Sequence, residues 1–214
     1  MNYLFFDTET TGLPRSYLPV THPSQPYIVQ LAAMLCDEGA RVLGSFYWLI
    51  DNDVEIPVEA SNVHGITRWM CTAAGHRPDF VLECFLHFYA RADMLVAHNC
   101  KFDMAMVETA FARGVLPGMT WKPLDKPCFC TMEASAPLVN LPPTPKMLAA
   151  GFNKPKAPKL AECVRHFFGE ELAGAHDAMV DVGACKRVFF HLKELEKNRA
   201  AIAALPFSPE NPNG

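Results

Sequence analysis

Short apolar runs that are followed at once by polar residues predict the strands of a buried sheet. Tyr3–Phe6 leads directly into an acidic stretch that starts at Asp7, and Met94–Ala97 leads into His98 and Asn99. Apolar runs of this length between polar segments are typical of strands that are covered on both faces. The pattern therefore places two polar segments at strand ends, far apart in the sequence.

A β-hairpin made of two further strands is predicted in the part of the sequence that separates these two strands. Residues 28–36 and 41–50 have the composition of strands, and Asp37-Glu38-Gly39-Ala40 between them contains turn residues, including a glycine.

Helical spacing of apolar residues, together with capping residues, predicts helices over 57–62, 67–74, 78–90, 103–113, 160–168 and 177–195. Strands that alternate with helices predict an α/β fold. A chain of 214 residues is long enough to bury one such core, and we place this domain at residues 1–197, followed by a flexible tail over 198–214.

Composition and charge narrow the class of protein. The formal net charge is −4, which argues against broad electrostatic binding to long duplex DNA. No run of about 18 apolar residues occurs, so no membrane span is expected, and the N-terminal apolar run is too short for a secretory signal. The eight cysteines include no Cys-x-x-Cys pair and are expected to be buried free thiols of a cytoplasmic protein.

Asp7 and Glu9 are the first candidates for chemistry. Side chains two apart in an extended strand point to the same side, so both carboxylates are expected at one point while Thr8 faces away. Carboxylates held together repel each other and resist desolvation, and Mg²⁺ or Mn²⁺, which prefer oxygen ligands, would remove both costs. The alternative is a pair of solvated acids at a strand end.

Three further residues occur in matching contexts. Asp103 lies just beyond the strand predicted at 94–97, where open α/β sheets bind ligands, although the helix dipole also explains an acid in a first helical turn. Asp177 is a good N-cap residue, which places His176 in the preceding loop and Asp181 in the first turns of the last helix. His176 and Asp181 then meet at one point, and a loop histidine is suited to proton transfer near neutral pH.

Together these motifs resemble those of the DEDDh family of 3′→5′ exonucleases, which are similar to the proofreading (epsilon) subunit of bacterial DNA polymerase III. The matching residues are Asp-Thr-Glu-Thr-Thr-Gly at 7–12, Asn99 with Phe102-Asp103, and His176-Asp177-Ala178 with Asp181, together with Glu59 and Val63-His64-Gly65-Ile66-Thr67. A histidine rather than a tyrosine five residues before the last aspartate selects the DEDDh branch.

The resemblance implies a ribonuclease H-like fold, a mixed central sheet flanked by helices. It implies two divalent ions, Mg²⁺ or Mn²⁺, held by Asp7, Glu9, Asp103 and Asp181, with His176 as the general base toward the attacking water. The residues implied to hold the 3′-terminal nucleotide are Thr10, Gly12, Leu13, Glu59, His64 and Asn99. The implied activity is release of nucleoside 5′-monophosphates from single-stranded DNA ends, with RNA as the alternative, because no motif encodes contacts to the 2′ position.

Two proline-rich segments depart from the family pattern. Residues 14–27 are predicted to form a loop whose Tyr17, His22 and Tyr27 either stack on bases or pack on the surface. Residues 121–160 hold six lysines and eight prolines against two acidic residues, and they are either a phosphate-contacting flap or a solvated surface loop. Instead of contacting the nucleotide, His64 could cap a turn and Leu13 could pack as an ordinary apolar residue.

Other functions stay open on the sequence. A phosphatase with an Asp-x-Asp-x-Thr nucleophile shares the acidic strand end, but position 9 is Glu and that mechanism leaves His176 and Asp181 without a role. A non-catalytic nucleic-acid-binding module would not need the complete carboxylate set. Among exonucleases, a proofreading subunit bound to a polymerase or clamp competes with a free-standing DNA or RNA trimming enzyme. Ala204-Leu205-Pro206-Phe207 is either a docking peptide for such a partner or part of the flexible tail.

Overall fold

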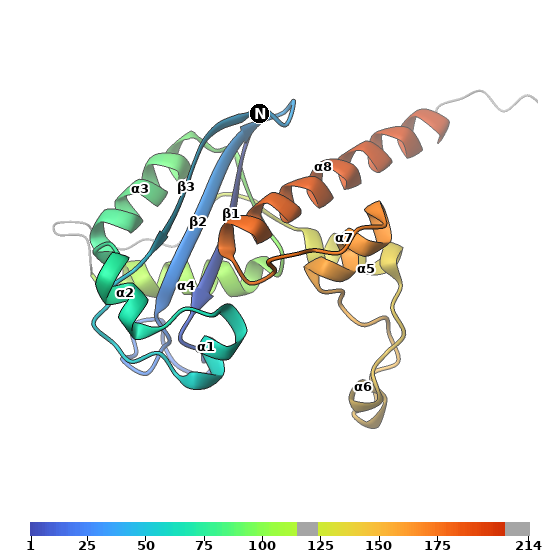
Figure 1. Cartoon of the computed structure of the whole chain (residues 1–214). Coiled ribbons are helices and arrows are strands. Elements are labelled where there is room, and N and C mark those ends of the chain that lie inside the picture. Colours follow the sequence, from blue (N-terminus) through green and yellow to red (C-terminus); the bar gives the residue numbers. More distant parts are fainter. Residues whose placement is uncertain (115–123, 204–214) are drawn as a thin grey trace, which may run out of the picture.

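A mixed β-sheet forms the centre of the protein (Figure 1). The computed structural model describes residues 1–114 and 124–203, and within them the sheet has five strands in the order β3-β2-β1-β4-β5. β2 lies between β1 and β3 and is antiparallel to both, whereas β4 is parallel to β1 and to β5. The strands are β1 Asn2–Thr10, β2 Ile28–Asp37, β3 Val42–Leu49, β4 Met94–Ala97 and β5 Cys128–Cys130.

Helices cover both faces of this sheet (Figure 1). The helices in the described residues are α1 Val58–His64, α2 Arg68–Ala74, α3 Pro78–Arg91, α4 Cys100–Ala112, α5 Thr131–Val139, α6 Pro145–Ala149, α7 Leu160–Phe168 and α8 Ala178–Ala203. None of them combines the length and the apolar character that a membrane-spanning segment needs.

Alternate residues of β1 serve the two faces of the sheet. Leu4 and Phe6 belong to the core shared with α3 and α4. Tyr3 and Phe5 pack on the opposite face against α8, where the Phe189 ring lies 4.8 and 5.4 Å from their ring centroids. Each fully buried aromatic ring contributes roughly 2 kcal/mol of hydrophobic stabilisation, so the helix layers fix β1 from both sides.

Most predicted elements are confirmed to within a few residues at their ends, and two differences stand out. α8 runs to Ala203, so the domain boundary that we place at residue 197 falls inside a helix. The segment 121–160, predicted to be a loop or flap, contains β5, α5 and α6. Pro145 occupies the first turn of α6, where a missing N–H costs nothing, whereas Pro137 lies inside α5 and removes one backbone hydrogen bond of that helix. The peptide 204–207 lies outside the described residues.

The loop of residues 14–27 is present as predicted, and Gln25 holds it in shape. This buried amide accepts one backbone N–H of the loop and donates toward three of its carbonyl oxygens, at 2.9–3.3 Å. The Arg113 guanidinium donates to two carbonyl oxygens of the loop and lies over the Tyr27 ring. Tyr27 therefore packs against the protein, whereas Tyr17 is exposed.

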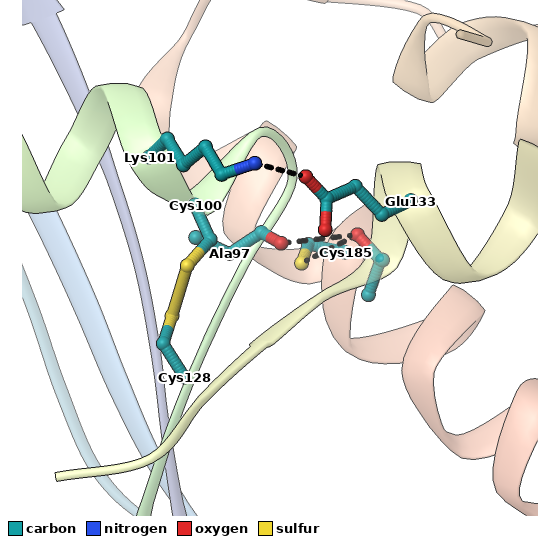
Figure 2. Close-up of a disulfide and its surroundings, with 7 residues drawn as sticks. Ala97, Cys100, Lys101, Cys128, Glu133 and Cys185 are labelled. Carbon is teal, nitrogen blue, oxygen red and sulfur yellow. Dashed lines mark hydrogen bonds and ion pairs between the residues drawn. A yellow bond between two sulfur atoms is a disulfide. The ribbon is translucent and has the colours of Figure 1, made fainter.

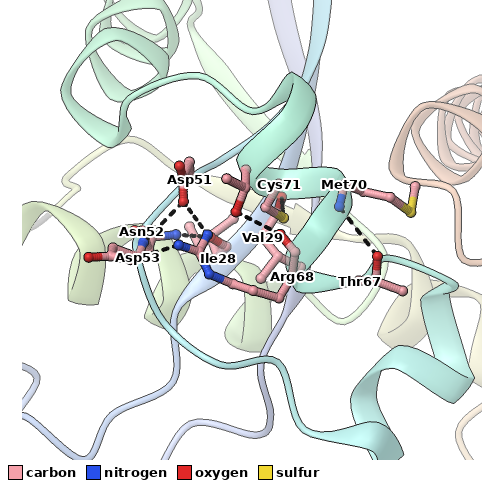
Figure 3. A network of polar contacts seen from close by, with 10 residues as sticks. Ile28, Val29, Asp51, Asn52, Asp53, Thr67, Arg68, Met70 and Cys71 are labelled. Atoms are coloured by element: carbon pink, nitrogen blue, oxygen red, sulfur yellow. Dashed lines mark hydrogen bonds and ion pairs between the residues drawn. The ribbon is translucent and has the colours of Figure 1, made fainter.

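Arg68 anchors α2 to the chain that follows β3 (Figure 3). Its guanidinium pairs with Asp51 and, at 2.7 Å, with Asp53. Thr67 caps the helix as predicted, because its hydroxyl accepts the backbone N–H of Met70. These contacts fix the segment that joins α1 to α2, next to one wall of the site described below.

Two of the eight cysteines are joined, so the expectation of free thiols is wrong for this pair. A disulfide links Cys100 at the start of α4 to Cys128 at the start of β5 (Figure 2). The two residues become neighbours because β5 pairs with β4, a contact that their separation of 28 residues hides in the sequence. The other six cysteines are free and lie buried or half-buried.

Candidate active site

Two carboxylates lie in the last part of β1. Asp7 and Glu9 are within the strand rather than beyond it, and both line a cleft with a volume of about 630 Å³. Glu9 is only 8% exposed. The alternative of two solvated acids is therefore wrong for this strand end.

The third carboxylate reaches β1 from α4. Asp103 is 2% exposed and lies in the first turn of that helix, after Asn99, which has the left-handed backbone conformation at φ 74°. Thr8, expected to face away from Asp7 and Glu9, donates both its N–H and its hydroxyl to Asp103 Oδ1, at 3.0 and 2.8 Å. The strand thus orients an acid that is 95 residues away in the chain.

The fourth carboxylate and the histidine come from the start of α8, as the capping argument predicts. Asp177 caps the helix by accepting the N–H groups of Met179 and Val180, at 3.0 and 3.2 Å. The backbone N–H of His176 donates to Asp181 Oδ2 at 3.0 Å, so the loop and the first helical turn are joined. The His176 backbone has φ 70°, and its side chain is exposed.

Burial and mutual repulsion raise the pKa of every one of these acids. The pKa of Glu9 rises to about 8, first because of desolvation and then because of the charges of Asp181 and Asp103. Desolvation raises the pKa of Asp103 to about 7, although the hydrogen bonds from Thr8 act in the opposite direction. The same causes raise the pKa of Asp7 well above its ordinary range, and desolvation raises that of Asp181.

A cation would balance this clustered charge, and one atom is arranged to bind it. Asp181 Oδ1 is buried and has no hydrogen-bond partner within the described residues. Ligand atoms of Glu9, His176 and Asp181 lie within 4.8 Å of one another. A buried acceptor without a partner costs about 1–3 kcal/mol, and a hard cation satisfies it. The residues present therefore fit a divalent metal ion with oxygen ligands.

The remaining predicted residues line the same cleft. They are Thr10, Gly12, Leu13, Glu59, His64 and Asn99. His64 Nδ1 accepts the N–H of Ile66 at 3.0 Å, so Nε2 carries the proton and donates to the carbonyl oxygen of Thr10 at 3.3 Å. His64 thus joins α1 to the end of β1. Leu13 does not pack as a core residue, because it is 80% exposed.

Sequence reasoning missed three residues that support the site. Besides Thr8, Gln30 on β2 accepts the buried N–H of Ala178 at 3.1 Å and so holds the start of α8 against the sheet. His98 lies between Thr131 and the carbonyl oxygen of Pro158, each at 3.0 Å, and lines the cleft. Of these residues, His98 could have been suspected from the sequence, because it directly precedes the candidate Asn99. The contacts of Thr8 and Gln30 depend on how distant segments meet in the fold.

Comparison with known proteins agrees with this geometry. The family model RNase_T, described as exonuclease, matches residues 4–189. A DNA polymerase III subunit epsilon-like protein of Rhodobacter capsulatus is 34% identical over 137 residues, which cover 64% of this chain and 17% of that protein. A PolC-type DNA polymerase III of Listeria monocytogenes is 34% identical over 112 residues, which cover 52% of this chain and 7% of that protein.

Among solved structures, E. coli exonuclease I in complex with a dT13 oligonucleotide matches with a TM-score of 0.69 at 20% identity. The match covers 94% of this chain and 43% of that one, so the chain spans less than half the length of each of these three relatives. The likeness confirms the predicted ribonuclease H-like fold.

The carboxylate cluster at the end of the central strand, together with the match to an exonuclease family model, defines the protein as a nuclease by class. More specifically, the chain belongs to the RNase_T exonuclease family, which confirms the resemblance to the DEDDh exonucleases. The roles of the individual site residues stay predictions.

Proposed function

We propose that this protein is a metal-dependent 3′→5′ exonuclease that releases nucleoside 5′-monophosphates from single-stranded DNA. The observation that carries the proposal is the buried, unpartnered Oδ1 of Asp181 beside Glu9 and His176. The cleft around it is within the size range of small-ligand sites, and it has room for a terminal nucleotide.

The four carboxylates of Asp7, Glu9, Asp103 and Asp181 would hold two ions, Mg²⁺ or Mn²⁺. Bound there, such ions offset the clustered negative charge, activate water and stabilise the leaving oxygen. The ring of His176 lies beside Glu9 and Asp181 on an exposed loop, from which it can take the proton of the attacking water and pass it to solvent.

The part of the cleft formed by α1, the start of α4 and the chain after β1 would hold the 3′-terminal nucleotide. Glu59 and Asn99 offer hydrogen-bond partners for the terminal sugar, and the exposed Leu13 offers an apolar surface for its base. DNA is the preferred substrate in this proposal because the exonuclease I structure that resembles this chain contains a dT13 oligonucleotide. RNA is the alternative that the experiment below includes.

The test compares 5′-labelled single strands of DNA and RNA of the same sequence, with Mg²⁺, Mn²⁺ or EDTA. We expect a ladder of strands shortened from the 3′ end and free mononucleotides with either metal, and no product with EDTA. Asp7→Asn should lower turnover to background, because it removes a ligand without changing the side-chain volume. Glu83→Gln, an exposed acid on α3, is the matched control and should retain full activity.

Two results would overturn the proposal. One is no 3′ shortening of either DNA or RNA with either metal, and the other is undiminished turnover by Asp7→Asn. Shortening of RNA but not of DNA would identify RNA as the substrate, and the proposed metal-dependent hydrolysis would still hold.

The names of two relatives support a polymerase partner. Both are DNA polymerase III proteins, so we propose that residues 1–197 form an exonuclease domain that works beside a replicative polymerase or clamp in the cytoplasm. Co-purification of the polymerase with the tagged protein from its own host would test this. Recovery of the protein without polymerase or clamp would favour a free-standing enzyme.

A further inference from the structure

Residues 141–159, which we call the arm, leave the body of the protein beside the cleft. Figure 1 shows α6 projecting beyond α5 and α7, at the same end of the molecule as α1. The ends of the arm meet, because the backbone N–H of Lys156 donates to the carbonyl oxygen of Leu141 at 3.0 Å. Compact surface loops with closed ends are frequently functional.

The base of the arm is a fixed part of the cleft wall. Glu162 on α7 accepts the ammonium of Lys156 at 2.6 and 2.9 Å and the backbone N–H of Lys159 at 2.7 Å. The half-buried ring of His98 contacts the carbonyl oxygen of Pro158 at 3.0 Å. Pro158 and Lys159 line the same cleft as the carboxylates, so the arm starts where a bound strand would leave the site.

The arm is positively charged next to an acidic site. Residues 134–161 contain four lysines and no acidic residue, in a chain with a formal net charge of −4. Glu162 neutralises Lys156. Lys146, Lys154 and Lys159 are exposed, and no ion pair to them occurs among the described residues. Their charge is therefore available to a ligand that is negative along its length.

Apolar side chains are exposed among these lysines. Phe152 is 56% and Leu148 is 52% exposed, both at the far end of the arm. The N–H of Phe152 donates to the carbonyl oxygen of Met147 at 2.9 Å, which fixes the backbone that carries the ring. Surfaces that bind single strands combine lysines, which contact the phosphate backbone, with exposed aromatic rings, on which bases stack.

We propose that the arm binds the single strand upstream of the terminal nucleotide. Lys146, Lys154 and Lys159 contact its phosphates, and Phe152 stacks on one of its bases. A single strand is the occupant because a duplex covers its base faces, and the chain as a whole is too acidic for broad duplex binding. This inference rests on the proposed function, since it continues the strand whose end lies in the cleft.

The test is the binding of a fluorescent single strand of about 12 nucleotides, with phosphorothioate linkages at its 3′ end to prevent hydrolysis. Affinity is measured by anisotropy over a range of salt concentrations, for DNA and for RNA. The arm variant is Lys146→Gln/Lys154→Gln/Lys159→Gln. The control is Arg41→Gln/Lys197→Gln/Arg199→Gln, which removes the same charge from exposed positions outside the arm and the cleft.

The arm variant should bind about tenfold more weakly at low salt. The slope of log affinity against log salt should become shallower by roughly 2, since each phosphate contact to a single strand contributes about 0.7. Phe152→Ala should weaken binding about tenfold with little change in slope, because stacking releases no counterions. The control variant should behave as the wild type.

Hydrolysis assays distinguish an effect of the arm on strand binding from an effect on the active site. Lys146→Gln/Lys154→Gln, which keeps the cleft-lining Lys159, should cleave a dinucleotide at the wild-type rate and show a raised KM only for the longer strand. A wild-type protein that cleaves neither substrate would overturn the proposed function, while the anisotropy would still decide the arm. Wild-type affinity and salt slope in the arm variant, or no strand binding by the wild type, would overturn the arm inference and favour a protein partner there.

Discussion

At the scale of single residues, Thr8 shows how a hydroxyl on a strand orients an acid on a helix. Its N–H and its O–H donate to the same oxygen of Asp103, and both groups are buried. Hydrogen bonds to the charged form lower a carboxylate's pKa, so Thr8 opposes the effect of burial on Asp103. Thr8 is a positioning residue in this site.

Thr8→Val keeps the shape of the side chain and removes its hydroxyl. We expect the free energy of unfolding to fall by about 1–2 kcal/mol and the affinity for Mn²⁺ to fall about tenfold, because the ligand Asp103 is less well oriented. Urea denaturation and calorimetric titration measure the two effects. Thr8→Ser should restore both, and equal Mn²⁺ affinity in the valine and serine variants would contradict this role.

His176 is either a base or a metal ligand, since its ring lies close to Glu9 and Asp181. Asparagine is a suitable replacement for His176 because it tolerates the left-handed backbone at φ 70°. The hydrogen bond from the backbone N–H of residue 176 to Asp181 is also retained. For a general base, His176→Asn should lower kcat about 10²–10⁴-fold and leave the Mn²⁺ affinity nearly unchanged. A large loss of Mn²⁺ affinity in the titration would instead identify the ring as a ligand.

The sequence predicts the residues that carry charge better than those that position them. Asp7 and Glu9 follow from strand alternation, and the pairing of His176 with Asp181 follows from a helix cap, and both of these signals are local. Thr8, Gln30 and His98 act through contacts between distant segments. No periodicity in the chain encodes such contacts, so they become visible only with the fold.

At the scale of elements, α8 depends on its N-cap. Asp177→Ala removes the acceptor of two N–H groups and should cost about 1 kcal/mol in the free energy of unfolding. Because His176 and Asp181 flank this cap, we also expect kcat to fall severalfold. Asp177→Ser keeps an acceptor at the cap and should restore stability and kcat together. Stability restored without recovery of kcat would indicate a direct role for the Asp177 charge.

The strand β5 shows why one element escaped prediction. Cys128-Phe129-Cys130 is too short for a periodic signal, and prolines surround it. It becomes a strand because Leu95, Val96 and Ala97 pair with it in parallel. By contrast, α3 and α7 bury apolar faces with helical spacing, which is a local signal, and both were predicted almost to the residue.

At the scale of the whole molecule, the active site opposes folding when no metal is bound. Desolvation and like charges raise the pKa of Glu9 to about 8 and that of Asp103 to about 7. For two carboxyls outside the site the pKa is lowered instead. Asp51 pairs with Arg68 and Glu171 pairs with Arg165, and each ion pair stabilises the ionised carboxylate. These two paired carboxyls are therefore ionised above about pH 5, where the site acids still titrate.

This difference predicts how stability depends on pH. A carboxyl with a raised pKa binds its proton more tightly in the folded chain, so its contribution is complete below about pH 4 and is lost as the pH rises toward about 8. In EDTA we expect about 2 kcal/mol less stability at about pH 8 than at about pH 5, a fall in Tm of roughly 4–8 °C. Differential scanning fluorimetry measures this, and the paired carboxyls of Asp51 and Glu171 do not contribute within that window.

Mg²⁺ or Mn²⁺ should reverse the trend, because a cation competes with protons for the same carboxylates and binds best when they are ionised. Saturating Mn²⁺ should therefore raise the Tm more at about pH 8 than at about pH 5. Glu9→Gln removes one of the raised acids and should flatten the pH dependence in EDTA, whereas Glu83→Gln should leave it unchanged. A Tm in EDTA that stays constant or rises between these pH values would show that the four carboxylates do not repel one another in the folded protein, and with that the argument for a metal at this site would fail.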